Sequence, residues 1–255
     1  MEREMPGKDN HNPSSRQRAR LALIILSFIL YPVTFAYVSC PFITEAAGQG
    51  ILTAGLIVFA LAFISSLFLG RLWCGWFCPS GGLQELVRFV HDPRLRTTKI
   101  DWLKYLVFLG IFGSIGYAIW SAGGLFTIDL LYRTENGISI LATGGIAAFL
   151  GPVIIVVIFT LIFGRRGFCH TFCPIAPMLM IGRKIRNFFG WPALQLAADR
   201  THCIDCNACS EECPMSIDIH AMVKEEKMEH AECIFCTSCI DICPKGAITY
   251  GIRKT

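Results

Sequence analysis

Long stretches without a charged residue constrain this chain more than any other feature. Such uncharged runs cover residues 21–38, 51–69, 105–122 and 138–163. A helix of about 20 residues, rising about 1.5 Å per residue, crosses the roughly 30 Å hydrocarbon core of a bilayer. The runs therefore predict four transmembrane helices, at about 21–38, 51–69, 105–122 and 141–163.

Composition supports burial in lipid. Hydrophobic residues make up 53% of the 255-residue chain and charged residues only 16%, whereas soluble domains carry roughly 25% charged residues. These figures argue against a purely soluble protein. The 19 Phe and 5 Trp argue against disorder of the whole chain, because disordered chains are poor in aromatic residues.

The distribution of Lys and Arg predicts the orientation of the spans. Residues 39–50 contain neither, and residues 123–137 contain only Arg133, whereas residues 1–20 and 70–104 are rich in both. Under the positive-inside rule both termini are cytoplasmic and the protein is a multi-pass protein of the cell membrane, in contact with lipid. A cleaved signal peptide is a weaker interpretation of the first span, because its apolar run is long and lacks a small-residue exit.

A cysteine motif occurs twice at an offset of 95 residues. Residues 71–79 read RLWCGWFCP after the second span, and residues 166–174 read RGFCHTFCP after the fourth. The same offset aligns Arg88 with Arg183. Two hairpins of the same orientation imply a pseudo-twofold axis along the membrane normal. Both Cys-x3-Cys-Pro motifs are then expected to meet at the cytoplasmic surface.

Cysteines four residues apart lie on one face of a helix and suit a shared metal ion, a cluster or a redox disulfide. The alternative is that they only pack, since a free cysteine behaves as a small hydrophobic residue. The doubling of the motif favours one redox or metal site. Its expected members are Cys74, Cys78, Cys169 and Cys173.

Other residues of the motif allow two interpretations. Arg71 and Arg166 would either lower the pKa of the thiols or bind an anionic lipid headgroup. His170 is a minor candidate for a metal ligand or a proton relay, because Gly75 stands at the matching position of the first motif.

The last 56 residues carry the densest cysteine pattern. Residues 203–214 and 233–244 both read Cys-x2-Cys-x2-Cys-x3-Cys-Pro, the spacing of a [4Fe-4S] site. Zinc and disulfides are disfavoured, the first by the spacing and the second by the expected cytoplasmic location. In the crossed pattern of two-cluster ferredoxins, one cluster has the ligands Cys203, Cys206, Cys209 and Cys243. The other has Cys213, Cys233, Cys236 and Cys239.

These features predict a domain plan. A basic tail (1–20) precedes a helical transmembrane domain (21–182), an amphipathic linker (183–199) and a two-cluster α+β ferredoxin domain (200–255). An amphipathic helix is expected after each Cys-x3-Cys-Pro motif, lying along the membrane surface with its polar residues opposite the apolar face. Gln84, Glu85 and Arg88 would form that polar face in the first repeat.

From about residue 20 onward, the spans, the paired Cys-x3-Cys-Pro motifs and the two-cluster pattern together resemble the membrane polyferredoxins of the NapH and NosR type. That resemblance implies quinol oxidation and electron delivery to a reductase. The related CcoG type shares the Cys-Pro motifs and implies copper reduction for oxidase assembly.

Our leading hypothesis is a membrane-anchored iron–sulfur protein, of the quinol dehydrogenase type, that passes electrons between the quinol pool and a redox partner. The alternative is a copper or metal reductase that serves as an assembly factor; a third possibility is an anchor whose clusters serve structure or sensing. A nucleic-acid partner is not expected, since no basic stripe is interleaved with aromatic residues. Haem b is not expected either, because no histidine lies within a span.

Overall fold

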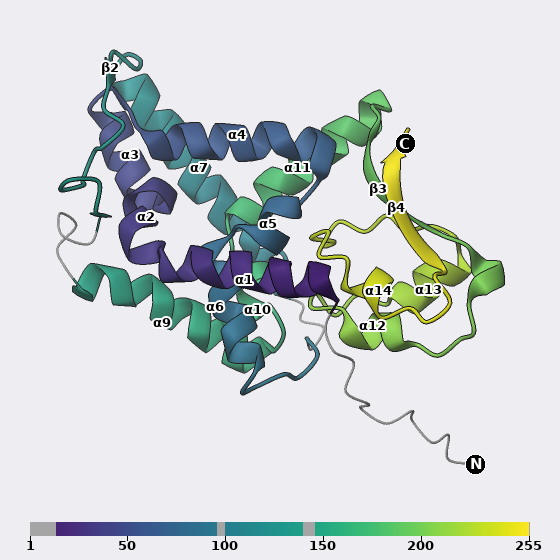
Figure 1. The fold of residues 1–255 in the computed structure, drawn as a ribbon. Helices are drawn as coiled ribbons and strands as arrows, with labels where there is room; N and C mark the ends of the chain where they lie inside the picture. Colours follow the sequence, from purple (N-terminus) through teal and green to yellow (C-terminus); the bar gives the residue numbers. More distant parts are fainter. Residues whose placement is uncertain (1–13, 96–99, 140–145, 255) are drawn as a thin grey trace.

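The computed structural model describes residues 14–95, 100–139 and 146–254. A helical part precedes a small C-terminal unit, and the two lie side by side (Figure 1). The helical part contains α1 (Ser15–Ile29), α2 (Tyr31–Val38), α3 (Cys40–Gly48), α4 (Ala54–Leu69), α5 (Leu72–Trp76), α6 (Pro79–Arg88), α7 (Leu103–Ser121), α9 (Ile146–Phe163), α10 (Gly167–Thr171) and α11 (Ile175–Phe189).

The four spanning helices predicted as two hairpins are not supported by the helix lengths. Among the described helices, only α7 is long and apolar enough to cross a membrane alone, and α1 with α2 qualify only as a pair bent by 79°. Pro32 explains the break at Leu30, because proline has no backbone N–H to donate to the carbonyl of Phe28 and its ring clashes with that carbonyl. Gly70, with a φ of 59°, ends α4 after 16 residues. Residues 140–145 of the fourth predicted span lie outside the described part.

The repeat predicted from the motifs is visible in the order of the elements. α4 and α9 are each followed by a five-residue helix, α5 or α10, that carries the first cysteine of the motif. A longer helix follows, and the motif proline stands at its start: Pro79 is the first residue of α6, and Pro174 precedes α11. Proline suits this position because the first helical residues need no backbone donor.

The two amphipathic helices bury several polar residues that were expected on their outer face, so the expected arrangement is wrong for those residues. In α6, Gln84 and Glu85 are 1% and 4% exposed, whereas Val90 just beyond the helix is 91% exposed. In α11, Arg183 and Arg186 are buried while Phe188 is 85% exposed. Helical periodicity separates a polar from an apolar face but does not say which face meets the protein interior.

Two loops that the charge pattern places on the external side meet in the structure. β1 (Ile51–Leu52) pairs in parallel with β2 (Thr127–Ile128). This pair lies at the end of the helical part that is farthest from the C-terminal unit (Figure 1).

The C-terminal unit begins earlier than residue 200. β3 (Ala193–Ala198) pairs antiparallel with β4 (Ile248–Arg253), and Ala193 faces Arg253 in the register. The segment expected as a linker, 183–199, is therefore divided between the end of α11 and this strand. Residues 15–20, expected as tail, form the first turns of α1. The unit also contains η1 (Arg200–His202), α12 (Ala208–Glu212), α13 (Ile219–Lys224) and α14 (Ser238–Asp241).

Candidate metal centres

The structure brings the eight cysteines of the C-terminal unit together in two groups of four. One cavity, here the outer cavity, is lined by Cys203, Cys206, Cys209 and Cys243. A second, the inner cavity, is lined by Cys213, Cys233, Cys236 and Cys239. Each group combines three cysteines of one motif with the last cysteine of the other, which are the sets that crossed ligation requires.

The loops that carry these cysteines share an unusual backbone. Asp205 and Asn207 have φ values of 59°, and the matching Phe235 and Thr237 have 51° and 62°. Left-handed backbone is costly for residues with a branched side chain such as Thr237, and it persists where the surrounding structure fixes it, often at ligand sites. The same conformation in both loops indicates that each wraps around an equivalent centre.

The two cavities differ in their surroundings. Cys206 is exposed at the outer cavity, whereas Cys236 and Cys239 of the inner cavity are buried. Apolar residues such as Ile217, Ile234 and Phe235 line the inner cavity. The outer cavity therefore lies nearer the surface of the molecule.

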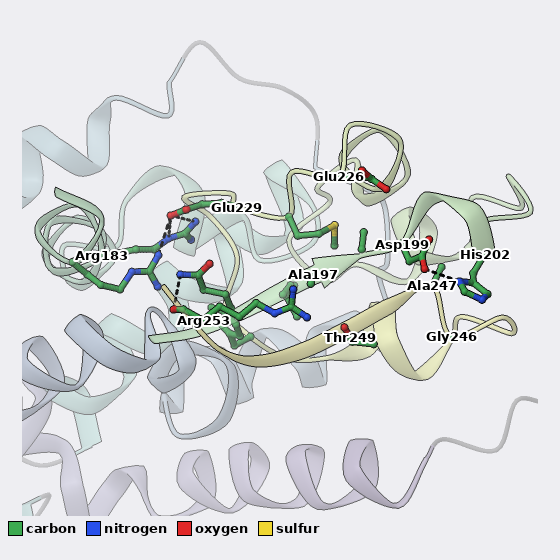
Figure 2. A pocket seen from close by; sticks show the side chains of 16 residues that line it. Arg183, Ala197, Asp199, His202, Glu226, Glu229, Gly246, Ala247, Thr249 and Arg253 are labelled. Carbon is green, nitrogen blue, oxygen red and sulfur yellow. Dashed lines mark hydrogen bonds and ion pairs between the residues drawn. The ribbon is translucent and has the colours of Figure 1, made fainter. Parts of the chain in front are cut away.

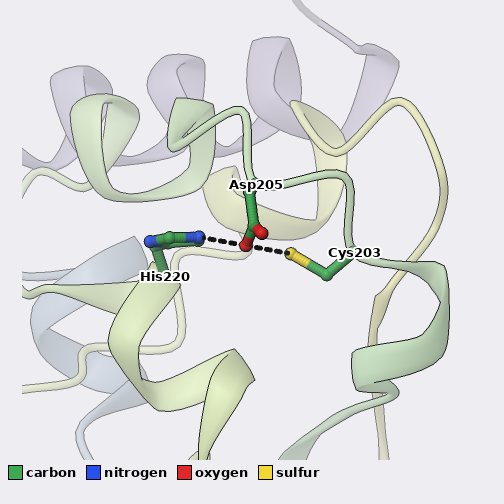
Figure 3. A group of neighbouring side chains, drawn as sticks. All are labelled: Cys203, Asp205 and His220. Atoms are coloured by element: carbon green, nitrogen blue, oxygen red, sulfur yellow. Dashed lines mark hydrogen bonds and ion pairs between the residues drawn. The ribbon is translucent and has the colours of Figure 1, made fainter.

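Figure 3 shows a side-chain group beside the outer cavity that sequence reasoning missed. The imidazole of His220 lies 2.7 Å from the Asp205 carboxylate, and the Cys203 thiol is 3.9 Å from the same oxygen. The ligand atoms of all three lie within 4.8 Å of one another. Because Cys203 also lines the outer cavity, we assign Asp205 and His220 to an ion pair at its edge.

The four cysteines of the Cys-x3-Cys-Pro motifs also converge. Each thiol is close enough to others of the set to perturb their ionisation. Burial, with repulsion from Cys74 and Cys169, raises the pKa of the Cys78 thiol to about 12. Gln84 donates from Nε2 to the Sγ of Cys169 at 3.2 Å. Burial also raises the pKa of the Cys74 and Cys173 thiols, so Cys74, Cys78 and Cys173 need a bound metal or strong local positive charge to ionise at neutral pH.

Positive charge is present in the form of two buried arginines. Arg71 and Arg166 are almost fully buried, so the lipid-headgroup interpretation is wrong for both. Arg71 pairs with Glu232 at 2.5 Å, and Arg166 pairs with Glu85 at 2.7 Å. Arg166 also donates to the backbone carbonyl of Cys74 at 2.7 Å.

These ion pairs leave the site with an excess of positive charge. Arg20 shares Glu85 with Arg166, and Lys104 shares Glu232 with Arg71. Burial opposes ionisation of each glutamate, but the neighbouring cations outweigh it and hold the pKa of Glu85 and of Glu232 at about 2. Four buried cations thus share two carboxylates, and the half-buried Arg88 lies 4.0 Å from Glu85.

Within the described part of the chain, several buried polar atoms near the same cysteines have no hydrogen-bond partner. They are Nε and Nη2 of Arg71, Nε of Arg166 and Oε1 of Gln84. Unpaired buried donors are costly, and an anionic metal–thiolate centre would satisfy both the donors and the excess charge. The chemistry of this donor set therefore fits a metal or cluster held by four thiolates.

The motif site and the inner cavity are in direct contact. A Cβ on Gly75 would lie 2.4 Å from the backbone oxygen of Ile234, which sits between Cys233 and Cys236. At the matching position of the second repeat, Nε2 of His170 lies 3.2 Å from the carbonyl oxygen of Met215. Each repeat thus touches one of the two segments that line the inner cavity.

Further contacts hold this junction in place. Trp76 donates to the carbonyl of Phe235 at 3.0 Å, and Gln17 donates to the carbonyl of Cys236 at 2.8 Å. The sequence did not predict that Gln17, Glu85 and Glu232 would lie at this site. Their burial depends on contacts between distant segments, and no local pattern announces it.

Comparison with known proteins agrees with the cysteine chemistry. The family model described as "4Fe-4S binding domain" matches residues 51–98 and 145–192, one match for each Cys-x3-Cys-Pro repeat. The model described as "4Fe-4S dicluster domain" matches residues 192–248. The C-terminal unit is thus an iron–sulfur domain. No solved structure matches the chain.

Curated relatives extend this likeness over most of the chain. Two uncharacterised proteins of Methanocaldococcus jannaschii are each 31% identical; one match covers 79% of both chains, and the other covers 90% of this chain and 81% of the relative. The regulatory protein NosR of Pseudomonas aeruginosa is 26% identical over 62% of this chain and 22% of its own length. On these motifs and matches, the chain belongs to the NapH/NosR-type, polyferredoxin-like family of iron–sulfur electron-transfer proteins.

Proposed function

We propose that this protein is a membrane-anchored electron relay with three iron–sulfur sites in series. Four thiolates from the Cys-x3-Cys-Pro motifs hold the first, and the inner and outer cavities hold a [4Fe-4S] cluster each. Each such cluster, when bound, accepts and releases one electron. The contacts of the surrounding residues determine the order in which an electron would pass through the three sites.

The junction between the motif site and the inner cavity carries this proposal. Gly75 and His170, one from each repeat, contact Ile234 and Met215, the neighbours of the inner-cavity cysteines. Arg71 reaches across the same junction to Glu232. Such close packing favours electron exchange between these two sites, and the outer cavity then lies on the side of a redox partner because Cys206 is exposed.

At the other end of the relay, we propose that electrons enter from quinol. A small, mainly apolar cavity adjoins Cys78 and is lined by Tyr31, Trp73 and Ser80, among others. The hydroxyl groups of Tyr31 and Ser80 could donate hydrogen bonds to a quinone headgroup beside the cysteine, or accept them from a quinol.

Membrane anchoring is supported by exposed apolar side chains on the helical part. They lie on α1, α4, α7 and α9, with Leu26, Leu61, Leu109 and Ile162 as representatives. We propose that lipid covers these surfaces and that both termini are cytoplasmic. Reporter fusions at Gly48 and Gly137 should then behave as external, and fusions at Arg94 and Thr255 as internal. An external fusion at Thr255 would contradict this orientation.

The relay is tested with anaerobically purified protein in liposomes. Iron analysis should find about twelve irons for three [4Fe-4S] sites, or about eight if only the C-terminal unit holds clusters. Addition of quinol should bleach the cluster absorbance, and the Cys74→Ser protein should not respond. Reoxidation by copper(II) without any response to quinol would favour the metal reductase alternative. Stoichiometric zinc without visible absorbance would overturn the cluster assignment.

A further inference from the structure

A large groove lies between α11 and the β3–β4 pair. Its volume is about 930 Å³, within the size range of about 300–1,000 Å³ that is common for small-molecule sites. Figure 2 shows Arg183, Arg253 and Glu229 toward one end of the groove, and Asp199, His202 and Glu226 toward the other. The groove therefore has a basic end and an acidic end.

At the basic end, two buried arginines share one carboxylate. Arg183 and Arg186 both donate to Oε1 of Glu229, at 3.0 and 3.1 Å. The amide of Asn187 donates to the same oxygen. One negative charge therefore faces two guanidinium groups, and Arg253 adds a third cation at the exposed end of β4.

Arg186 has donor capacity that the protein does not use. Its side chain is 1% exposed, and its Nη1 has no hydrogen-bond partner among the residues that the structure describes. Burial and the nearby charge of Arg183 lower the pKa of Arg186 despite the contact with Glu229. Arg186 lines the groove, and a guanidinium that keeps a free donor favours an anion bound beside it.

We propose that the basic end of this groove binds a phosphate group through Arg186, with Arg183 and Arg253 supplying further charge. The planar guanidinium favours oxyanions such as phosphate. The phosphate comes either from an anionic lipid headgroup or from a soluble phosphate compound. Phe188 and Phe189 follow Arg186 closely in the sequence, and both are exposed at the end of α11. Exposed aromatic residues of this kind are common where a protein meets a membrane surface.

The groove adjoins the inner cavity, because Leu196 and Phe235 line both of them. This inference does not require the electron relay, since phosphate binding is measured on its own.

The test uses the full-length protein in detergent and in nanodiscs. Inorganic phosphate should raise the midpoint of thermal unfolding relative to chloride at equal ionic strength if the source is soluble. If the source is lipid, native mass spectrometry should find phosphatidylglycerol retained from nanodiscs containing it, and phosphatidylcholine should not be retained. Arg186→Gln should weaken whichever interaction is seen by about 10- to 100-fold.

Two further variants keep the test decisive. Lys184→Gln removes an exposed cation of the same helix that does not line the groove, and it should leave binding unchanged. Arg253 lies at the exposed rim of the groove, so Arg253→Gln should leave the fold intact and weaken phosphate binding by a few-fold. The proposal would be overturned if neither inorganic phosphate nor phosphatidylglycerol bound the wild-type protein. It would also be overturned if Arg186→Gln and Lys184→Gln lost the same amount of binding affinity.

Discussion

The two Cys-x3-Cys-Pro repeats share their arginine, both cysteines and the proline but have different neighbours. Arg71 of the first repeat pairs with Glu232 of the C-terminal unit, whereas Arg166 of the second pairs with Glu85 of the first repeat. Gly75 allows close contact with Ile234, whereas His170 reaches Met215. The repeated residues supply thiols and positive charge, and Arg71 together with the differing positions Gly75 and His170 connects the site to the C-terminal unit.

The strongest test of the shared residues is replacement of the cysteines. Serine at Cys74, Cys78, Cys169 or Cys173 should abolish quinol-dependent reduction while leaving the clusters of the C-terminal unit spectroscopically intact. The reason is that one shared site needs thiolates from both repeats. Quinol-dependent cluster bleaching and electron paramagnetic resonance measure the two outcomes.

Cys40 provides the matched control for these cysteine variants. It is also a buried free cysteine, but it packs in the apolar cluster with Ile43 and Phe59. Cys40→Ala should retain electron transfer. Normal transfer in all four motif variants would show that the motif cysteines are structural.

Glu85 belongs to the first repeat only, because Met180 stands at the matching position of the second. Glu85→Gln would leave Arg20 and Arg166 buried without their carboxylate, and we expect a loss of about 3–5 kcal/mol in the free energy of unfolding. Denaturant unfolding measures it. Glu45→Gln, which breaks an exposed pair with Arg133, should have no measurable effect; equal losses in both variants would contradict the role of burial.

Gly75 tests the junction with the inner cavity. In Gly75→Ala the new Cβ would lie 2.4 Å from the Ile234 oxygen, so the C-terminal unit must shift. We expect a loss of about 1–3 kcal/mol in stability and slower reduction of the C-terminal clusters by quinol, measured by stopped-flow absorbance. Gly116→Ala in α7, where a Cβ meets nothing within 4 Å, should behave as wild type. If Gly75→Ala matched that control, close packing would not be required.

The smallest effect is expected at the matched pair Arg88 and Arg183. Arg88 pairs with Glu212 at 3.2 Å in a partly exposed position, whereas Arg183 pairs with Glu229 and is buried. Arg88→Ala should cost about 0.2–1 kcal/mol, and Arg183→Ala should cost more because it leaves polar partners buried. Thermal unfolding followed at the cluster absorbance compares them, and a larger effect of Arg88→Ala would reverse the comparison.

The cysteine sets of the C-terminal unit were predictable because most ligands of such a cluster are only a few residues apart in the sequence. Cys203, Cys206 and Cys209 lie within one loop, so three ligands are local and only the fourth must come from the matching motif. The 95-residue repeat likewise predicts that Cys74 and Cys169 share one site, and the two thiols lie close enough in the structure to affect each other's ionisation. The spans were less predictable, since an uncharged run gives a length but does not reveal the break at Pro32.

By itself, the sequence determined the iron–sulfur chemistry, the repeat and the apolar character of the helical part, because each depends on residue type at short or constant spacing. Only the tertiary structure decided that Glu85 and Arg186 face inward, that Glu232 neutralises Arg71, and that Gly75 touches Ile234. An amphipathic pattern does not say which of its two faces the rest of the protein covers. Ion pairs between distant segments leave no pattern in the local sequence. Those choices follow from how the two repeats and the C-terminal unit pack together.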